Sequence, residues 1–291
     1  MPRDVCLIVN PHAGGGRAER RLPEVEAALR AHGATFRVER TTSMDHAREL
    51  ARAAIAAGEL PTAMGGDGLT GAVAGEVRGT DGALGIVPGG RGNDFARKLG
   101  IPDDPEAAVQ ALVAGTERIV DVAEADGRVY VGIASAGLDS DVQVIANSTR
   151  LKLGNLVYLY GTLRALLSWK PARWTVTLDG ERREFSGYSV AVANSGVFGG
   201  GMYLVPGASL DDGRLDVVLC GESSRRHYLA GLPRVFKGTH VDDPALEFLT
   251  AREVTFSADR PFTAYADGDP LVDLPATIRI VPRSLRVRVP A

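Results

Sequence analysis

The residues best placed to do chemistry form a glycine turn containing one acid, Gly65-Gly66-Asp67-Gly68-Leu69-Thr70-Gly71. The turn lies between a strand-like run and a helix-like run. Glycines let backbone N–H groups close around an anion, and the N-terminal end of the following helix adds partial positive charge. Asp67 could hold a metal ion beside that anion or accept a proton from an attacking hydroxyl. The combination favours metal-assisted phosphoryl transfer.

The same turn matches the G-x-G-x-x-G pattern of dinucleotide-binding proteins, but its chemistry argues against that use. Asp67 would place a second negative charge against a bare pyrophosphate. No acidic residue ends the next strand to bind a ribose hydroxyl, because residues 84–87 run into Pro88-Gly89-Gly90-Arg91. A dinucleotide site is therefore the weaker interpretation.

Two other glycine loops and one threonine follow strand-like runs in the same way. They are Asn10-Pro11-His12-Ala13-Gly14-Gly15-Gly16, Thr41 and Gly90-Arg91-Gly92-Asn93-Asp94. Each loop alone could be a surface turn or a helix cap, and Asp67 itself could be an N-cap. The carboxyl ends of parallel strands share one edge of a sheet, where ligands bind. The loops together therefore predict a phosphate site, in which Arg91 could bind phosphate oxygens in a bidentate manner.

Alternating apolar runs and amphipathic stretches predict the elements that position these loops. Strands are expected at residues 5–9, 35–40, 62–64, 83–87 and 118–122, and helices at residues 18–31, 44–57 and 105–114. This alternation predicts an α/β N-terminal domain with an open parallel sheet, spanning residues 1–124.

The pattern becomes β-rich from residue 125, with hairpin signals such as Asp179-Gly180. We therefore predict an antiparallel second domain at residues 125–291, whose C-terminal segment could pack back on the first. Strands are expected at residues 130–135, 174–178, 184–193, 214–220, 254–257, 262–266 and 277–281, and helices at residues 156–167 and 225–236.

Composition excludes several classes of protein. The net charge is −3 and Lys and Arg are scattered, which argues against a nucleic-acid surface. Cys6 and Cys220 lie in apolar runs without metal-ligand spacing, which favours free thiols in a reducing compartment. The sequence shows no signal-peptide pattern and no apolar run long enough to span a bilayer. We predict a cytoplasmic protein that can contact a membrane peripherally.

Three further stretches have two interpretations each. Residues 151–169, rich in Leu, Tyr and Trp, favour core packing, with an apolar wall for an acyl chain as the alternative. Asp267-Gly268-Asp269 alone favours a hairpin turn. Ser209-Leu210-Asp211-Asp212-Gly213-Arg214 also favours a turn, although its closely spaced oxygens could hold a hard cation such as Mg²⁺.

Four motifs in this order resemble the diacylglycerol kinase catalytic-domain family: Asn10-Pro11 with Gly14, residues 65–68, residues 87–96 and Asp267-Gly268-Asp269. The family includes bacterial soluble lipid kinases and the sphingosine and ceramide kinases. The resemblance covers nearly the whole chain. It implies an NAD-kinase-like and diacylglycerol-kinase-like α/β domain, a C-terminal β-sandwich domain and an active site between them. It also implies ATP- and Mg²⁺-dependent phosphorylation of a lipid hydroxyl, as in diacylglycerol.

The same resemblance implies roles for individual residues. The catalytic carboxylates would be Asp67, Asp267 and Asp269, with the choice of base left open. Ser209, Asp212 and the carbonyl of Arg214 would bind a structural Mg²⁺. ATP would be bound by Asn10, Pro11, Gly14, Thr41, Gly65, Gly66, Asp67, Gly68, Thr70, Gly71, Gly90, Arg91, Gly92, Asn93 and Asp94.

Three residues depart from the family pattern: Leu69 and Arg91 each stand in place of Thr, and Asp269 stands in place of Glu. Thr70 could substitute for the hydroxyl that Leu69 lacks. These departures keep open the alternative of a catalytically weak nucleotide- or lipid-binding regulator. A kinase of a soluble substrate resembling NAD kinase is the other alternative, because related glycine-Asp turns occur in such enzymes. The expected partners are ATP, a lipid and a membrane surface, without nucleic acid. The oligomeric state stays open, with a homodimer among the alternatives.

Overall fold

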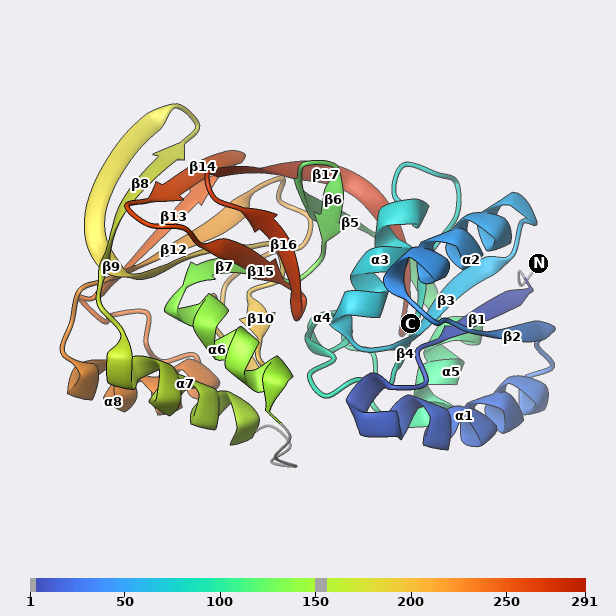
Figure 1. Ribbon diagram of the computed structural model, residues 1–291. Helices are drawn as coiled ribbons and strands as arrows, with labels where there is room; N and C mark the ends of the chain where they lie inside the picture. The colour runs from blue at the N-terminus through green and yellow to red at the C-terminus, as the bar shows by residue number, and fades with distance from the viewer. Residues whose placement is uncertain (1–3, 150–155) are drawn as a thin grey trace. The chain divides into compact units, whose positions relative to one another are not determined.

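The computed structural model describes residues 4–149 and 156–291, and the chain divides into two compact units (Figure 1). The first unit contains the chain up to Val122 together with Val129–Val131 and Pro282–Ala291. The second contains Ala123–Arg128 and Gly132–Val281. The chain therefore leaves the first unit and returns to it at its end.

A four-stranded parallel sheet forms the centre of the first unit, with the strand order β2-β1-β3-β4. Figure 1 shows α1 and α5 on one face of this sheet and α2 and α3 on the other. All five residues of β1 are buried, as expected for a strand covered on both faces. The bounds are β1 Val5–Val9, β2 Phe36–Arg40, β3 Leu60–Gly65, β4 Gly85–Pro88, α1 Ala13–Ala31, α2 Met44–Ala56, α3 Asp67–Val77, α4 Asp94–Lys98 and α5 Pro105–Ala114.

Local sequence signals explain where several of these helices begin. Ser43 caps α2 by accepting a hydrogen bond from the His46 amide at 3.1 Å. Asp104 caps α5 by accepting one from the Ala107 amide at 3.0 Å, and Pro105 takes the first helical position. The prediction of an α/β domain with a parallel sheet is confirmed.

The second unit is built mainly on antiparallel strands in the order β16-β15-β7-β9-β8-β14-β17, with β12 pairing with β9 and β13 pairing with β12. Helices α6, α7 and α8 lie beside these strands in Figure 1. The predicted antiparallel domain is confirmed. Its bounds are β7 Ile133–Gly137, α6 Leu138–Ser148, α7 Leu156–Ser168, β8 Ala172–Leu178, β9 Glu181–Ala193, β10 Val197–Phe198, β11 Met202–Tyr203, β12 Leu215–Gly221, α8 Arg225–Lys237, β13 Leu246–Ala251, β14 Glu253–Ala258, β15 Thr263–Ala266, β16 Asp269–Asp273 and β17 Ala276–Val289.

Asp-Gly pairs close three hairpins. Asp126-Gly127 joins β5 (Thr116–Ala125) to β6 (Arg128–Tyr130), Asp179-Gly180 joins β8 to β9, and Asp267-Gly268 joins β15 to β16. Both residues of each pair have positive φ, which is the conformation that two-residue hairpin turns require. The turn predicted at Asp179-Gly180 is therefore confirmed.

Some elements differ from expectation. The strand expected at residues 130–135 is two strands, β6 and β7, because the chain breaks at Gly132, whose N–H donates to the Asp267 carboxylate at 2.9 Å. Helix α6 and strand β13 were not anticipated. Within residues 4–149 and 156–291, no helix is both long and apolar enough to cross a bilayer.

Candidate active site

The predicted phosphate loops of the first unit lie against one another at the carboxyl ends of β1, β3 and β4. A Cβ atom added to Gly90 would lie 2.4 Å from the Cα of Gly66, and one added to Gly14 would lie 2.7 Å from the carbonyl oxygen of Gly89. Only glycine permits backbone contacts this close. The Gly89 and Gly90 N–H groups also donate to the Gly65 carbonyl at 2.8 and 2.9 Å. The three glycine loops therefore form one cluster.

Asp67 lies inside this cluster. It is the first residue of α3, with Gly66 in the N-cap position, and its Oδ1 accepts a hydrogen bond from the Phe95 N–H at 3.0 Å. Its Oδ2 would lie 3.3 Å from a Cβ added to Gly92. One carboxylate oxygen thus holds the start of α4, and the other faces the glycine turn that precedes it.

The surroundings of Asp67 have opposing effects on its charge. Burial raises the pKa of the Asp67 carboxyl above its usual range, and backbone N–H groups, that of Phe95 foremost, partly offset this shift. A carboxylate that is desolvated but held by amides is preorganised to bind a cation or a proton.

The loop after β1 has an unusual backbone. Gly14, Gly15 and Gly16 all have left-handed φ angles, so the regular part of α1 starts after them. The helix start expected at residue 18 agrees with this. Asn10 holds the loop from the other side, because its Oδ1 accepts a hydrogen bond from the His12 N–H at 3.0 Å. Asn10 thus holds the backbone of this loop, which is the orienting position expected from the sequence.

A side-chain bridge that the sequence did not suggest connects two of the loops. Arg17, which directly follows Gly16, donates to Oδ1 of Asp103 at 2.8 Å, and the same oxygen accepts a hydrogen bond from Asn93 at 3.2 Å. Asn93 has a left-handed φ of 52° and accepts the Gly90 N–H at 2.8 Å. Asp103 therefore ties the loop after β1 to the loop after β4. No local signal marks it, because its partner Arg17 is 86 positions away.

Three further predicted residues have clear positions. Thr41 is buried at the end of β2, where its N–H donates to the Val9 carbonyl at 2.9 Å. Thr70 is buried, and its hydroxyl donates to the Gly66 carbonyl at 3.2 Å. Arg91 is exposed on its turn. Pro11 belongs to the loop after β1, Gly68 and Gly71 lie in the N-terminal part of α3, and Asp94 is the first residue of α4.

The Leu69 departure has a packing explanation. Leu69 is 1% exposed, and its Cδ2 would lie 2.7 Å from a Cβ added to Gly65. It therefore fills the space beneath the glycine turn. This position supports the backbone of the site from its buried side.

Asp267 and Asp269 belong to the second unit. Asp267 begins the turn between β15 and β16, and its Oδ1 accepts the Gly132 N–H at 2.9 Å. Asp269 is the exposed first residue of β16. The hairpin interpretation of this motif is correct.

The segment from Ser209 to Arg214 is rich in oxygen donors. The Ser209 hydroxyl donates to Asp211 at 2.7 Å, and Asp212 accepts the Arg214 N–H at 3.0 Å. Hydroxyl, carboxylate and carbonyl oxygens within one turn fit the ligand preference of Mg²⁺. Among the described residues, no group of three or more His, Cys, Asp or Glu side chains could hold a metal ion.

Comparison with known proteins agrees with the division of the chain into an α/β unit and a β-rich unit. The model of the diacylglycerol kinase catalytic domain matches residues 4–125, and that of the YegS C-terminal NAD kinase beta sandwich-like domain matches residues 132–289. The chain belongs to the diacylglycerol kinase family. It is an enzyme of the lipid kinase class of phosphotransferases, and its second unit is the β-sandwich-like domain that the resemblance implied.

Individual relatives of this lipid kinase extend over its whole length. The diacylglycerol kinase of Mycobacterium tuberculosis (strain H37Rv) is 34% identical over 98% of this chain and 95% of its own. A probable YegS-like lipid kinase of Pseudomonas aeruginosa (strain PAO1) is 30% identical over 100% of this chain and 96% of its own. A putative diacylglycerol kinase of Bacillus anthracis, 24% identical, shares the fold with a TM-score of 0.83 over 99% of this chain and 97% of its own.

Proposed function

We propose that this lipid kinase transfers the γ-phosphoryl group of ATP to a hydroxyl of a lipid such as diacylglycerol in a Mg²⁺-dependent reaction. The observation that carries the proposal is the cluster of glycine loops around Asp67. Close contacts between glycines of the loops and the Phe95-to-Asp67 hydrogen bond hold the three glycine loops together, and these loops are the predicted phosphate site. The M. tuberculosis relative named diacylglycerol kinase supports the choice of lipid.

The proposed reaction is an in-line displacement at the γ-phosphorus. A bond forms from the acceptor oxygen to phosphorus, the bond from phosphorus to the β,γ-bridging oxygen breaks, and ADP leaves. A carboxylate takes the hydroxyl proton, with Asp67, Asp267 and Asp269 as the candidates. Loop N–H groups stabilise charge on the transferring group. Asp67 would hold Mg²⁺, which when bound supplies further neutralising charge to the phosphates.

An assay on the full chain with ATP, Mg²⁺ and mixed micelles of candidate lipids tests the proposal, with products read by mass. We expect phosphatidic acid from diacylglycerol. Asp67→Asn keeps an oxygen for the Phe95 N–H but removes the charge, so the rate should fall by a factor of about 100 or more.

Asp45→Asn is the matched control, because this carboxylate is 88% exposed on α2 and pairs with Arg48. It should retain the parental rate. A folded Asp67→Asn protein that phosphorylates lipid at the parental rate would refute the role of Asp67. Phosphorylation confined to soluble metabolites would refute the lipid acceptor.

A further inference from the structure

Helix α7 carries large apolar side chains on its outer side. Leu163 is 46% exposed and Leu167 is 77% exposed. They are four positions apart, so they lie one above the other on the same face of the helix. Residues 151–155, also part of the apolar stretch recognised in the sequence, lie outside the described residues.

The other side of α7 is its packing side. Ala165, Leu166 and the adjacent Trp169 are buried in a cluster with Leu138 and Tyr188. The expected core packing is therefore correct for that side only. The packing side already supplies the contacts that hold α7 in place. Leu163 and Leu167 are therefore not needed for the core.

Helix α8 begins beside the end of α7. Arg225 at its start donates to the carbonyl oxygen of Trp169 at 3.4 Å, and Leu229 packs on the same apolar cluster as Leu166. None of the thirteen residues of α8, all of which the structure describes, is fully buried. Helix α8 is therefore a surface helix that meets α7 at this corner.

The charge of this corner is opposite to that of the whole chain. Helices α7 and α8, of thirteen residues each, contain no Asp or Glu, whereas the chain as a whole has a net charge of −3. Arg234 is neutralised by Asp242 and Asp243. The exposed basic residues that remain in α7, at the corner and in α8 are Arg164, Lys170, Arg225, Arg226 and Lys237.

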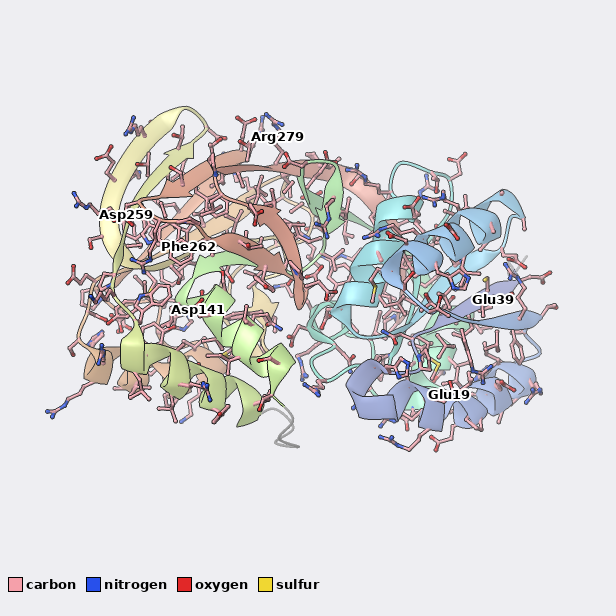
Figure 2. The ribbon with its side chains drawn as sticks, in the orientation of Figure 1. Glu19, Glu39, Asp141, Asp259, Phe262 and Arg279 are labelled. Atoms are coloured by element: carbon pink, nitrogen blue, oxygen red, sulfur yellow. The ribbon has the colours of Figure 1, made fainter. Side chains whose placement is uncertain are left out.

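Other acidic residues lie beside this region. Glu222 precedes α8, and Asp141, labelled in Figure 2, lies on α6 and interacts electrostatically with Arg260. The Arg260 guanidinium in turn lies over the ring of Trp169, 5.1 Å from its centroid. Arg260 therefore balances Asp141, whereas Asp139, also in the first turn of α6, accepts a hydrogen bond from Tyr228 of α8.

We propose that the α7–α8 face, formed by Leu163, Arg164, Leu167, Lys170, Arg225 and Arg226, docks on the surface of a bilayer that contains anionic lipid. The inference rests on the proposed lipid-kinase function, because a water-insoluble acceptor resides in such a surface. Exposed leucines on a helix enter the acyl boundary, and the arginines and lysine contact the headgroups. The positive charge favours an anionic membrane over a neutral one.

Cosedimentation of the full chain with vesicles tests this proposal. One vesicle contains phosphatidylcholine alone and the other contains phosphatidylcholine with phosphatidylglycerol. We expect binding to the phosphatidylglycerol vesicles that weakens with salt. Arg226→Glu should weaken this binding at least about fivefold, since one basic residue near an anionic surface contributes roughly that factor. Leu167→Glu should weaken it by at least about as much, because it places a charge where an apolar side chain would enter the acyl boundary.

Arg182→Glu is the matched control. It makes the same charge change on β9 in the same unit, where Arg182 is exposed beside Glu184, and it should bind as the parent does. Equal binding of the parent to both vesicles, or no binding to either, would overturn the proposal. So would an equal loss of vesicle binding in Leu167→Glu, Arg226→Glu and the control Arg182→Glu. A dimer in solution that Leu167→Glu dissociates, without vesicle binding, would overturn it in favour of a second copy of the chain.

A second measurement separates this proposal from the kinase assignment. Phosphorylation of a short-chain diacylglycerol in detergent micelles requires no bilayer. Leu167→Glu should keep the parental rate there while losing the rate on vesicles. If Leu167→Glu also lost its rate in micelles, the docking role would be overturned. If the parent itself showed no kinase activity, only the proposed function would be refuted.

Discussion

Asp139 shows how one partly buried acid of the second unit responds to its surroundings. It lies in the first turn of α6, and the Tyr228 hydroxyl donates to it at 3.5 Å. Burial raises the pKa of Asp139 to about 6, and hydrogen bonds from Ser189 and Tyr228 limit this rise. No sequence pattern marked this residue, because its environment comes from α8 and β9.

The raised pKa of Asp139 predicts a pH-dependent stability. Between about pH 4 and pH 6 the folded protein keeps a proton that the unfolded chain has released, so the free energy of unfolding falls as the pH rises through this window. The Asp139→Asn side chain cannot ionise, so this variant should not show that fall in the free energy of unfolding. Its stability relative to the parent should increase by up to about 3 kcal/mol from pH 4 to pH 7, measured by urea unfolding at each pH.

Tyr228→Phe is the companion variant for this measurement. It removes a hydrogen bond that lowers the pKa of Asp139, so its loss of stability with rising pH should be at least as large as the parent's. If Asp139→Asn followed the parental pH curve, another group would have to cause the dependence.

At the scale of elements, the site depends on how three loops are held together. The Asp103 bridge between Arg17 and Asn93 joins the start of α1 to the loop before α4. Asp103 itself lies between α4 and α5 and belongs to neither loop. It is therefore a positioning residue in the proposed nucleotide site.

Asp103→Ala should raise the KM for ATP while leaving kcat within about twofold. The exposed ion pairs with Arg17 and Arg21 and the hydrogen bond from Asn93 are together worth about 1 kcal/mol, which corresponds to roughly a fivefold change in KM. Steady-state kinetics over a range of ATP concentrations measures both constants.

Glu106→Ala is the control for Asp103→Ala, because it removes another exposed carboxylate, bound to His32 at 3.0 Å, without touching a glycine loop. Its KM should equal the parent's. Asp103→Asn can still accept from Arg17 and Asn93 at one oxygen, although it loses the ion pair with Arg21, so it should recover most of the loss. A parental KM in Asp103→Ala would show that the loops hold their positions without the bridge.

At the scale of the whole molecule, the end of the chain completes the first unit. The Arg288 N–H donates to the Leu84 carbonyl at 2.9 Å, and the Leu84 N–H donates to the Arg286 carbonyl at 2.8 Å. Leu285 and Val287 are fully buried. The C-terminal part of β17 thus supports the strand that leads into the loop at residues 89–94.

Leu285→Ala should therefore lower the free energy of unfolding by about 3 kcal/mol, through lost burial and the cavity that remains. Arg286→Ala, whose side chain is exposed between the two buried residues, should change it by less than about 0.5 kcal/mol. Urea unfolding of both variants makes the comparison. A loss below about 1 kcal/mol for Leu285→Ala would mean that the C-terminal strand contributes little to stability.

Sequence patterns by themselves determined much of this protein. The bounds of β1 and α5 agree with expectation because continuous apolar runs, proline and capping residues act locally. The glycine loops were recognisable because only glycine permits their backbone conformations and close contacts. Residue types at fixed spacing therefore determined the α/β fold and the phosphate-site candidates around Asp67.

Only the tertiary structure decided the rest. Asp103 and Asp139 acquire their partners, and Leu285 its burial, from segments distant along the chain, and no local pattern encodes such contacts. The same holds for α7, where one helix carries both core residues and exposed leucines, because which side is buried depends on the neighbouring elements. Local conformational preference can be read from neighbouring residues, whereas burial and long-range pairing exist only once the chain has folded.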